Sequence, residues 1–336
     1  MSYLPTVTAV VPSYNHGQYI QQRIESILNQ TYKNIELIVI DDGSQDHSDE
    51  VINSMLAQHK FRYIRNKKNT GTPFAAWENV LSLATGSYIW VCESDDFAEP
   101  HFLETAVSAL ETNKAAVIFY CNSWIVDSSG ERVGHTSTYF HDVWKETRWD
   151  TDFCADGFQE LLDFQLRGQT VPNMSSTLIR AQAFRTAYRP FLKKLKLTGD
   201  WLFVGDLLYH GRVVFCTKAL SNFRRHEQTS RVRVKSARSQ AEFILTKYLL
   251  FRKGGCPVRE FADLMKTDVI RFLYEPAGLG DVLKQLLQIS WSNSFRCVAL
   301  LAVSVLMNRQ YLGKFQERYK HSKSIVNESH SLDNDD

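Results

Sequence analysis

The chain has 336 residues, of which 44% are hydrophobic and 23% are charged, a composition typical of a globular protein with a sizeable core. Its formal net charge of +2 argues against a general nucleic-acid-binding protein. The six cysteines lie far apart and form no CxxC pair, which disfavours a zinc site or a disulfide framework and fits a reducing cytosol.

The first 123 residues alternate between strand and helix patterns. Short β-branched apolar runs predict buried strands, and apolar residues at helical spacing predict helices. Asn15 is expected to cap the first helix, while Pro73 and Gly86 mark the beginning and end of the third. The expected strands are residues 6–14, 35–42, 61–66, 87–93 and 115–123, and the expected helices are 15–30, 44–59, 72–86 and 94–110. This order predicts an α/β fold, a mostly parallel sheet with helices on both faces.

The alternation weakens after residue 123. The sequence "DSSGE" predicts a hairpin turn, and residues 135–172 are irregular and rich in aromatic side chains. Further expected elements are a short helix at 156–168, strands at 176–184 and 211–226, and helices at 237–254, 257–275 and 279–290. We predict a main domain over 1–235, a helical segment over 236–322 and a disordered tail over 323–336.

One late apolar stretch bears on membrane contact. Residues 297–308, bracketed by Arg296 and Arg309, are too short to span a bilayer, so we expect a buried helix. Shallow attachment to a membrane surface is the alternative. The N-terminus shows no basic segment followed by an apolar stretch, so we expect no signal peptide. The expected location is cytoplasmic, with the inner face of the cytoplasmic membrane as the alternative place.

Polar clusters follow three expected strands, at residues 13–15, 41–42 and 93–96. Ligands of parallel sheets bind beyond the carboxyl ends of the strands, so these clusters predict one binding site. Glu93, Asp95 and Asp96 crowd three acids behind an apolar strand, which is costly without a cation. Such carboxylate clusters suit Mg²⁺ or Mn²⁺, which usually also hold a substrate phosphate. Helix capping is the alternative, but it accounts for only one of the acids.

Asp41 and Asp42 head the sequence "DDGSQD". Ordinary turn chemistry is one explanation. The other is that a carboxylate accepts hydrogen bonds from a nucleobase N–H or a ribose hydroxyl. The region has no GxGxxG or GxxxxGKS/T pattern, which disfavours a Rossmann dinucleotide site and a P-loop.

Several motifs occur in a fixed order between residues 6 and 123. They are a "PSYN" strand end, the "DDGSQD" turn, "NTG" followed by "ATGSYI", and "ESDD". Taken together, they resemble the family 2 glycosyltransferases of GT-A fold, with weaker matches to about residue 230. The resemblance implies a nucleotide-diphospho-sugar donor, a divalent metal and inversion of the anomeric carbon. It also divides the main domain into a nucleotide-sugar half (1–123) and an acceptor half (124–235).

The resemblance implies roles for residues at the first two strand ends. Pro12 and Tyr14 would line the base and ribose pocket. Asp42 would hydrogen-bond the base, with support from Asp41.

The resemblance also implies different roles for the three acids at 93, 95 and 96. Asp95 aligns with the metal-binding acid, and Asp96 would lie near the donor sugar or the metal. Glu93 stands where most members have Asp, and it would contact the ribose or an outer-shell water. The expected nucleotide-sugar site is completed by Asn15, Asn69 and Ser94.

A general base is also required, because the acceptor hydroxyl loses its proton as it attacks. The sequence "LTGDWLFVGDLLYHG" resembles the element that carries this base in the family, with Asp200 in the base position and Gly199 where Glu often stands. The alternative for Asp200 is a helix N-cap. Asp206 is expected to be structural.

The stretch "NFRRHEQTSR" resembles a late element of the family. His226 would contact the metal or a diphosphate oxygen, and Arg224 or Arg225 would offset leaving-group charge, with Arg225 assigned to the site. A basic solvated loop is the alternative. For the aromatic tract around Tyr139 and Trp149, an acceptor platform and a local core both stay open.

The combined reading is a metal-dependent, inverting glycosyltransferase that uses Mn²⁺ or Mg²⁺. Family frequency favours a UDP-linked donor over a GDP- or dTDP-linked one. The expected acceptor is a glycan or lipid-linked glycan of a bacterial surface polysaccharide, and no nucleic-acid partner is expected. The C-terminal helices would contact a membrane, form a homodimer or close the acceptor site. The alternatives are a sugar-1-phosphate nucleotidyltransferase, a non-catalytic sugar-nucleotide-binding module and a polymerising synthase.

Overall fold

The computed structural model describes residues 4–226, 236–265, 279–290, 293–294 and 296–300. The chain falls into two compact units, Met1–Val234 and Lys235–Asp336. Three predicted features lie outside the described residues in whole or in part: the tail at 323–336, the second half of the helix at 257–275, and residues 301–308 of the apolar stretch. The functional division of the main domain stays a prediction.

The first unit is built on one sheet with the strand order β3-β2-β1-β4-β9-β6-β10-β5, in which β7 also pairs with β6 and β8 with β10. The strands of the first half are β1 (Val7–Ser13), β2 (Ile35–Asp41), β3 (Arg62–Arg65), β4 (Tyr88–Val91) and β5 (Phe97–Ala98). Those of the second half are β6 (Ala116–Val126), β7 (Arg132–His135), β8 (Phe153–Ala155), β9 (Thr177–Arg180) and β10 (Arg212–Arg224).

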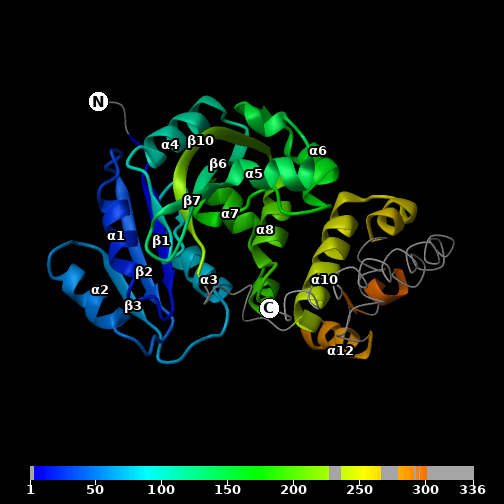
Figure 1. The fold of residues 1–336 in the computed structure, drawn as a ribbon, viewed down its shortest axis with the longest axis horizontal. Helices are drawn as coiled ribbons and strands as arrows, with labels where there is room; N and C mark the ends of the chain where they lie inside the picture. The colour runs from blue at the N-terminus through cyan, green and yellow to red at the C-terminus, as the bar shows by residue number, and fades with distance from the viewer. Residues whose placement is uncertain (1–3, 227–235, 266–278, 291–292, 295, 301–336) are drawn as a thin grey trace, which may run out of the picture. The chain divides into compact units, whose positions relative to one another are not determined.

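Helices connect these strands and cover both faces of the sheet (Figure 1). The helices of the first half are α1 (Ile20–Leu28), α2 (Ser48–Leu56), α3 (Phe74–Leu83) and α4 (Phe102–Thr112). The second half adds α5 (Thr136–Tyr139), α6 (Gly157–Glu160), α7 (Ala181–Ala187) and α8 (Gly199–Leu208). The predicted α/β class is confirmed.

Strand directions agree with the sequence in the first half and depart from it in the second. β1 to β4 run parallel to one another, as predicted. β9 is antiparallel to both β4 and β6, while β6 and β10 are again parallel. A sheet with mixed directions follows, because after residue 123 the chain no longer alternates strand with helix.

Successive side chains of the central strands point to opposite faces of the sheet, so the hydrophobic core lies on both faces. Val7, Ala9 and Val11 point into a cluster shared with buried side chains of α1, α2 and α4. On another side of the fold, the rings of Trp77, Phe184 and Phe203 pack from α3, α7 and α8 with centroids 4.9–6.1 Å apart. Apolar burial on both faces fixes the register of β1 and therefore the point at which it ends.

Three element boundaries differ from the sequence prediction. The helix expected from residue 94 begins at Phe102 with His101 as its N-cap, because residues 97–98 pair with β10 as β5. The aspartates at 95 and 96 therefore do not cap it. Asn15 does not cap α1 either: the N-cap is Tyr19, and Asn15 has a left-handed φ of 55°. The strand expected at 176–184 ends at Arg180, where the alanine-rich α7 begins.

Much of the aromatic tract after β7 is local core. Phe140 and Trp149 are 1% and 2% exposed, and their rings stack with centroids 4.6 Å apart. Trp149 Nε1 donates to the hydroxyl of the buried Tyr120 at 2.8 Å. These side chains stabilise the second half of the sheet and are not available as an acceptor platform.

The described part of the second unit is helical, as predicted. It contains α10 (Ser236–Gly254) and α12 (Leu279–Ile289), and in it the ring of Phe261 packs on Phe251 with centroids 4.6 Å apart. Among the described residues, none of the helices combines the length and the apolar character that a membrane crossing requires.

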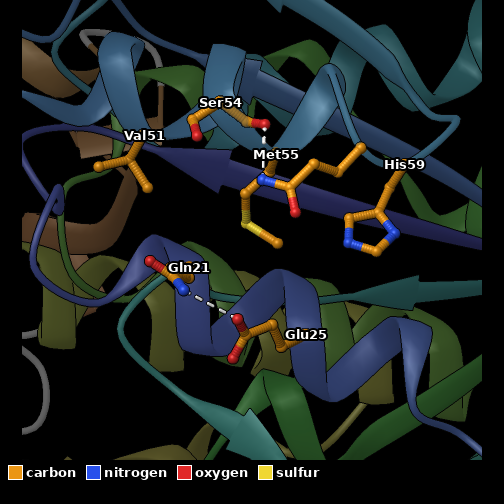
Figure 2. Close-up of a pocket in the computed structure, with 7 residues that line it drawn as sticks. Gln21, Glu25, Val51, Ser54, Met55 and His59 are labelled. Atoms are coloured by element: carbon orange, nitrogen blue, oxygen red, sulfur yellow. Dashed lines mark hydrogen bonds between the residues drawn. The ribbon is translucent and has the colours of Figure 1, made fainter.

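A small hollow of about 150 Å³ lies between α1 and α2 (Figure 2). It is bounded on the α1 side by Gln21 and Glu25, whose side chains are hydrogen-bonded at 2.9 Å. The α2 side contributes Val51, Ser54, Met55, Gln58 and His59. None of the predicted site residues lines this hollow.

We predict that Gly157→Ala destabilises the first unit by about 2–3 kcal/mol or more, because overpacking of a tight contact forces the backbone to shift. A Cβ at Gly157 would lie 1.9 Å from the carbonyl oxygen of Gly211 and 2.3 Å from that of Leu208. Gly134→Ala is the matched control, since its Cβ would meet Ile125 at an ordinary 3.6 Å. Urea unfolding measures both, and equal stability of the two variants would contradict the prediction.

Candidate active site

The loops after β1, β2 and β4 lie side by side at one edge of the sheet, as predicted. Ser13 is in register with Asp41, and the backbone N–H of Asp42 donates to Ser13 O at 2.8 Å. On the other side of β1, the backbone N–H of Cys92 donates to Val10 O at 2.8 Å. The carboxyl ends of three parallel strands therefore bring the polar clusters to a common place.

Asp95 forms the centre of a cluster with two histidines. Its Oδ2 lies 3.0 Å from Nε2 of His226, which follows the end of β10. The imidazole of His16 lies 5.7 Å from that of His226 between ring centroids, and one ligand atom from each of these three residues lies within 4.8 Å of the others. Burial raises the pKa of Asp95, but the hydrogen bond from His226 and the charges of His16 and His226 outweigh it, so the pKa of this carboxyl lies below its ordinary value.

Asp96, the next residue, is more deeply buried than Asp95. It is 1% exposed, and its Oδ1 accepts a hydrogen bond from the backbone N–H of Arg224 at 2.9 Å. Burial, followed by the neighbouring charge of Asp95, raises the pKa of Asp96 to about 7, although Arg224 and Arg23 act in the other direction. The two adjacent aspartates thus differ in environment, which is how a site separates the roles of two carboxyl groups.

Two buried arginines supply positive charge beneath these acids. The guanidinium of Arg224 donates to Asp95 O at 2.7 Å and to Gln22 Oε1 at 2.6 Å, and it lies over the Tyr19 ring. Arg23 on α1 is fully buried over the Trp90 ring, 4.8 Å from Cζ to the ring centroid. Arg23 lowers the pKa of both Cys92 and Asp96. The alternative of a basic solvated loop is therefore wrong for Arg224, whereas Arg225 is exposed.

Glu93 and Ser94 occupy the start of the same turn. The backbone N–H of Glu93 donates to Ser175 Oγ at 3.0 Å, and its carbonyl accepts from Asp96 N at 3.2 Å. Ser94 is 2% exposed, and its Oγ lies 2.8 Å from Nδ1 of His16. The turn is therefore tied to the residues that precede β9 and to the loop after β1.

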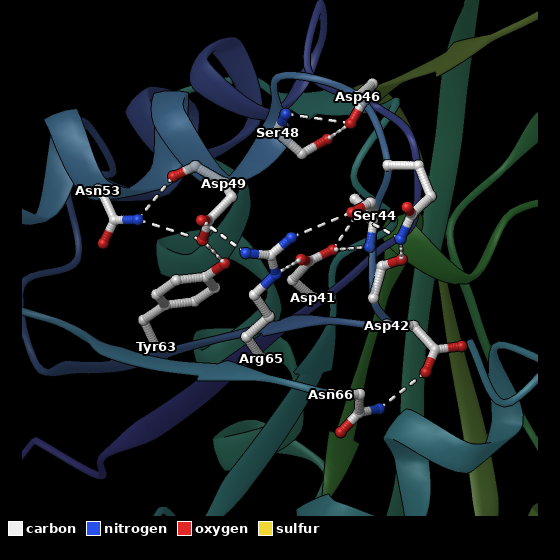
Figure 3. A network of polar contacts seen from close by, with 12 residues as sticks. Asp41, Asp42, Ser44, Asp46, Ser48, Asp49, Asn53, Tyr63, Arg65 and Asn66 are labelled. Carbon is white, nitrogen blue, oxygen red and sulfur yellow. Dashed lines mark hydrogen bonds and ion pairs between the residues drawn. The ribbon is translucent and has the colours of Figure 1, made fainter. Parts of the chain in front are cut away.

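Asp41, the last residue of β2, is held within the protein (Figure 3). It is fully buried, its Oδ1 accepts from the backbone N–H and the hydroxyl of Ser44, and its Oδ2 lies 3.2 Å from Nε of Arg65. Arg65 also pairs with Asp49 at 2.7 Å. This arrangement fixes the backbone before Asp42, and the supporting role of Asp41 in nucleotide binding stays a prediction.

Asp42 points to the loop between β3 and α3. One oxygen accepts from Nδ2 of Asn66 at 2.7 Å, and the other accepts from the backbone N–H and hydroxyl of Thr70 at 2.9 and 2.7 Å (Figure 3 shows the Asn66 contact). Gly43 follows with a φ of 75°, and a Cβ there would lie 3.0 Å from Asn69 N. Asp42 therefore precedes a tight turn at Gly43 and also binds the loop between β3 and α3.

The remaining residues assigned to the nucleotide-sugar site lie at the same edge. Pro12 is near the end of β1 and in register with Ile40 on β2, and Tyr14 directly follows β1 with a half-buried side chain. Asn15 Oδ1 accepts from Gln45 N at 2.8 Å. Asn69 is exposed and its Oδ1 accepts from Gly71 N.

Asp200 lies in a different segment, the first turn of α8. The helix begins at Gly199 with Thr198 as its N-cap, so the capping alternative for Asp200 is wrong. Asp200 Oδ1 accepts from the backbone N–H of Trp201 at 2.8 Å. A Cβ on Gly199 would lie 2.4 Å from the Phe74 ring, which explains why no glutamate stands there. Asp206 pairs with Arg189 at 2.9 Å, as expected for a structural residue.

The sequence analysis missed His16, Arg23 and Ser175. His16 had a usable signal, because it follows the first predicted strand at the edge where ligands bind. Arg23 and Ser175 had none, since their relation to the acids depends on contacts between distant segments.

A divalent metal fits the residues present. Two donor sets share Asp95, one with His16 and His226 and one with Glu93 and Asp96. His226 Nδ1 and Asp96 Oδ2 are buried and have no hydrogen-bond partner among the described residues. Carboxylate and imidazole donors in this number are typical of a metal site with open positions.

Known proteins show the same sequence pattern. The sequence model of the family described as Glycosyl transferase family 2 matches residues 8–162. An uncharacterized glycosyltransferase of Haemophilus influenzae is 32% identical over 241 residues, which are 69% of this chain and 69% of that protein. The chain belongs to the family 2 glycosyltransferases.

Other family members match a shorter part. Glycosyltransferase GlyG of Streptococcus pneumoniae is 36% identical over 112 residues, which are 33% of this chain and 37% of GlyG. Chondroitin synthase of Pasteurella multocida is 32% identical over 39% of this chain, but the match spans only 14% of that protein.

Solved structures confirm the GT-A fold for this family 2 glycosyltransferase. TarS 1–349 of S. aureus, in complex with UDP-GlcNAc, superposes with a TM-score of 0.65 at 15% identity and covers 94% of this chain and 92% of that one. The mannosyltransferase PcManGT of Pyrobaculum calidifontis, in complex with GDP-Man and Mn²⁺, has a TM-score of 0.57 at 15% identity, with 93% and 84% covered.

We predict that Arg224→Met lowers the free energy of unfolding by about 3 kcal/mol or more, because it leaves buried acceptors and acids without their cation. Arg225→Met is the matched control on an exposed neighbour and should change stability by less than about 0.5 kcal/mol. Denaturant unfolding of both variants tests this. A loss of similar size in the two variants would show that the burial of Arg224 is not what matters.

Proposed function

We propose that this protein transfers a sugar from a nucleotide-diphospho-sugar to an acceptor hydroxyl, with metal assistance and inversion of the anomeric carbon. The observation that carries the proposal is the pairing of Asp95 with His226 at the end of β4 in a family 2 glycosyltransferase. This pairing joins a carboxylate and an imidazole at the sheet edge where ligands of parallel sheets bind.

The donor would lie across the loops after β1 and β2. Pro12 and Tyr14 would line the base and ribose pocket, and Asn15 and Asn69 would border it. Asp42 would accept a hydrogen bond from the base, with Asp41 locked behind it by Ser44 and Arg65. A UDP-linked donor is favoured, because the TarS structures are described with UDP and UDP-GlcNAc.

Asp95 and His226 would hold Mn²⁺ or Mg²⁺, which would stabilise the charge of the leaving diphosphate. Exposed Arg225, next to His226, would add positive charge on the same side. Asp96, which is fixed by Arg224, would orient the turn beside the donor sugar. Glu93 would approach the ribose, and Ser94 would lie next to His16.

Asp200 would act as the general base for the acceptor hydroxyl. As the acceptor oxygen would form its bond to the anomeric carbon, its proton would pass to the Asp200 carboxylate, and the bond from that carbon to the diphosphate would break on the opposite face of the sugar, releasing the nucleoside diphosphate. Its place in the first turn of α8, packed through Gly199 on Phe74, gives it a backbone that cannot move freely.

A glycan or lipid-linked acceptor in bacterial surface polysaccharide synthesis fits the matched family members, among them GlyG and chondroitin synthase. The cytoplasmic location, the membrane contact and the homodimer stay predictions. The family match argues against a nucleotidyltransferase. Release of nucleoside diphosphate from a labelled donor would separate a transferase from a module that only binds.

We predict that Asp200→Asn lowers kcat by at least about 10²-fold and leaves donor binding within about twofold, because it removes a general base but little volume. Asp95→Ala or EDTA should instead abolish both metal-dependent donor binding and transfer. Nucleotide release and calorimetric titration with UDP-sugars measure the two effects.

Asp206→Asn serves as the control, since Asp206 is on the same helix but pairs with Arg189. It should change stability without changing kcat of the folded fraction. An Asp200→Asn enzyme with the wild-type rate would refute the assignment of the base.

A further inference from the structure

His16 is held firmly beside Asp95 by the chain around it. The left-handed φ of Asn15 turns the backbone directly before it, and Asn15 Oδ1 accepts from Gln45 N. The carbonyl of His16 accepts from the backbone N–H groups of Tyr19 and Ile20 at 2.9 Å each. The backbone at His16 is therefore fixed by the loops after β1 and β2 and by the residues that begin α1, as is typical of a residue that binds a ligand.

The imidazole of His16 has the second contact that metal-binding histidines usually have. Its Nδ1 lies 2.8 Å from Oγ of Ser94, and Ser94 is 2% exposed. When Nδ1–H donates to Ser94, Nε2 keeps a lone pair for a metal. Ser94 is also the neighbour of Asp95 in sequence, so one turn orients two donors.

The two possible donor sets differ in accessibility. Asp96 in the acidic set is 1% exposed, and its Oδ1 already accepts from Arg224 N, so this carboxyl group is little accessible to an incoming ion. As whole residues, His16, Asp95 and His226 are half-buried, and the side chains of Asp95 and His226 are 18% and 4% exposed. His226 Nε2 lies 3.0 Å from Asp95 Oδ2, and its Nδ1 is buried without a hydrogen-bond partner among the described residues.

We propose that His16 is a third protein ligand of the metal, beside Asp95 and His226, and that this site therefore selects Mn²⁺ over Mg²⁺. The proposal builds on the proposed function, which places only Asp95 and His226 on the metal. Mg²⁺ binds through oxygen ligands and keeps several waters, whereas first-row transition metals accept imidazole nitrogen. Two imidazoles and one carboxylate are therefore a poor set for Mg²⁺.

The test measures Mn²⁺ binding to the full chain by electron paramagnetic resonance, without any nucleotide. Wild type should show echo modulation from two directly bound imidazole nitrogens. His16→Asn should show one, should bind Mn²⁺ at least about 10-fold more weakly, and should lose less affinity for Mg²⁺ in competition. His59→Asn is the control, because His59 is an exposed histidine at the α1–α2 hollow of Figure 2, and it should match wild type.

One bound nitrogen or none in the wild-type spectrum would overturn the proposal, and this result needs no variant to fold. Unchanged Mn²⁺ affinity in a folded His16→Asn protein would also overturn it. Because no donor is present, the result is separate from the proposed function. A protein with two bound nitrogens that releases no nucleotide from any sugar nucleotide would refute the transferase reaction and leave the metal site standing.

Discussion

Two adjacent carboxyl groups at the buried end of β4 set the constraint on which the rest of the site depends. Removing such charges from water is costly unless cations and hydrogen bonds offset the loss. Asp95 is compensated by two histidines and its pKa lies low, whereas Asp96 is only partly compensated and its pKa rises to about 7. The buried Arg23 and Arg224 supply positive charge that stays in place when a ligand leaves.

The end of β10 brings compensating residues to these two carboxyl groups. This strand runs parallel to β6, pairs with the short β5 directly after the acids, and ends at Arg224. The sheet thus brings Arg224 and His226 to a turn formed some 130 residues earlier in the chain, as the separations of 128 and 131 positions show. The antiparallel β9 lies between β4 and β6 and allows this strand to reach the same edge.

The sequence predicted what local patterns encode. The parallel half of the sheet, the turn at Asp41 and Asp42 and the acids after β4 follow from period-two burial and turn residues within short windows. What it could not predict depends on distant segments. Arg23 occupies an ordinary place on a helix, and only the position of Trp90 shows it to be buried. The sequence does not explain why Gly199 stands where Glu often stands in the family. In the structure, the Phe74 ring occupies the space that a side chain at position 199 would need.

The bond from Asp42 to Thr70 couples events across the enzyme. The loop that Asp42 holds continues through Gly71, whose carbonyl accepts from Lys196 Nζ, and Thr72, whose hydroxyl donates to Leu195 O at 2.9 Å. Lys196 lies just ahead of the helix that carries Asp200. In the proposed reaction, a nucleobase that competes for the Asp42 carboxylate would pull on this chain of contacts. Donor binding would then be linked to the position of the helix that carries Asp200, which would favour an ordered addition of the two substrates.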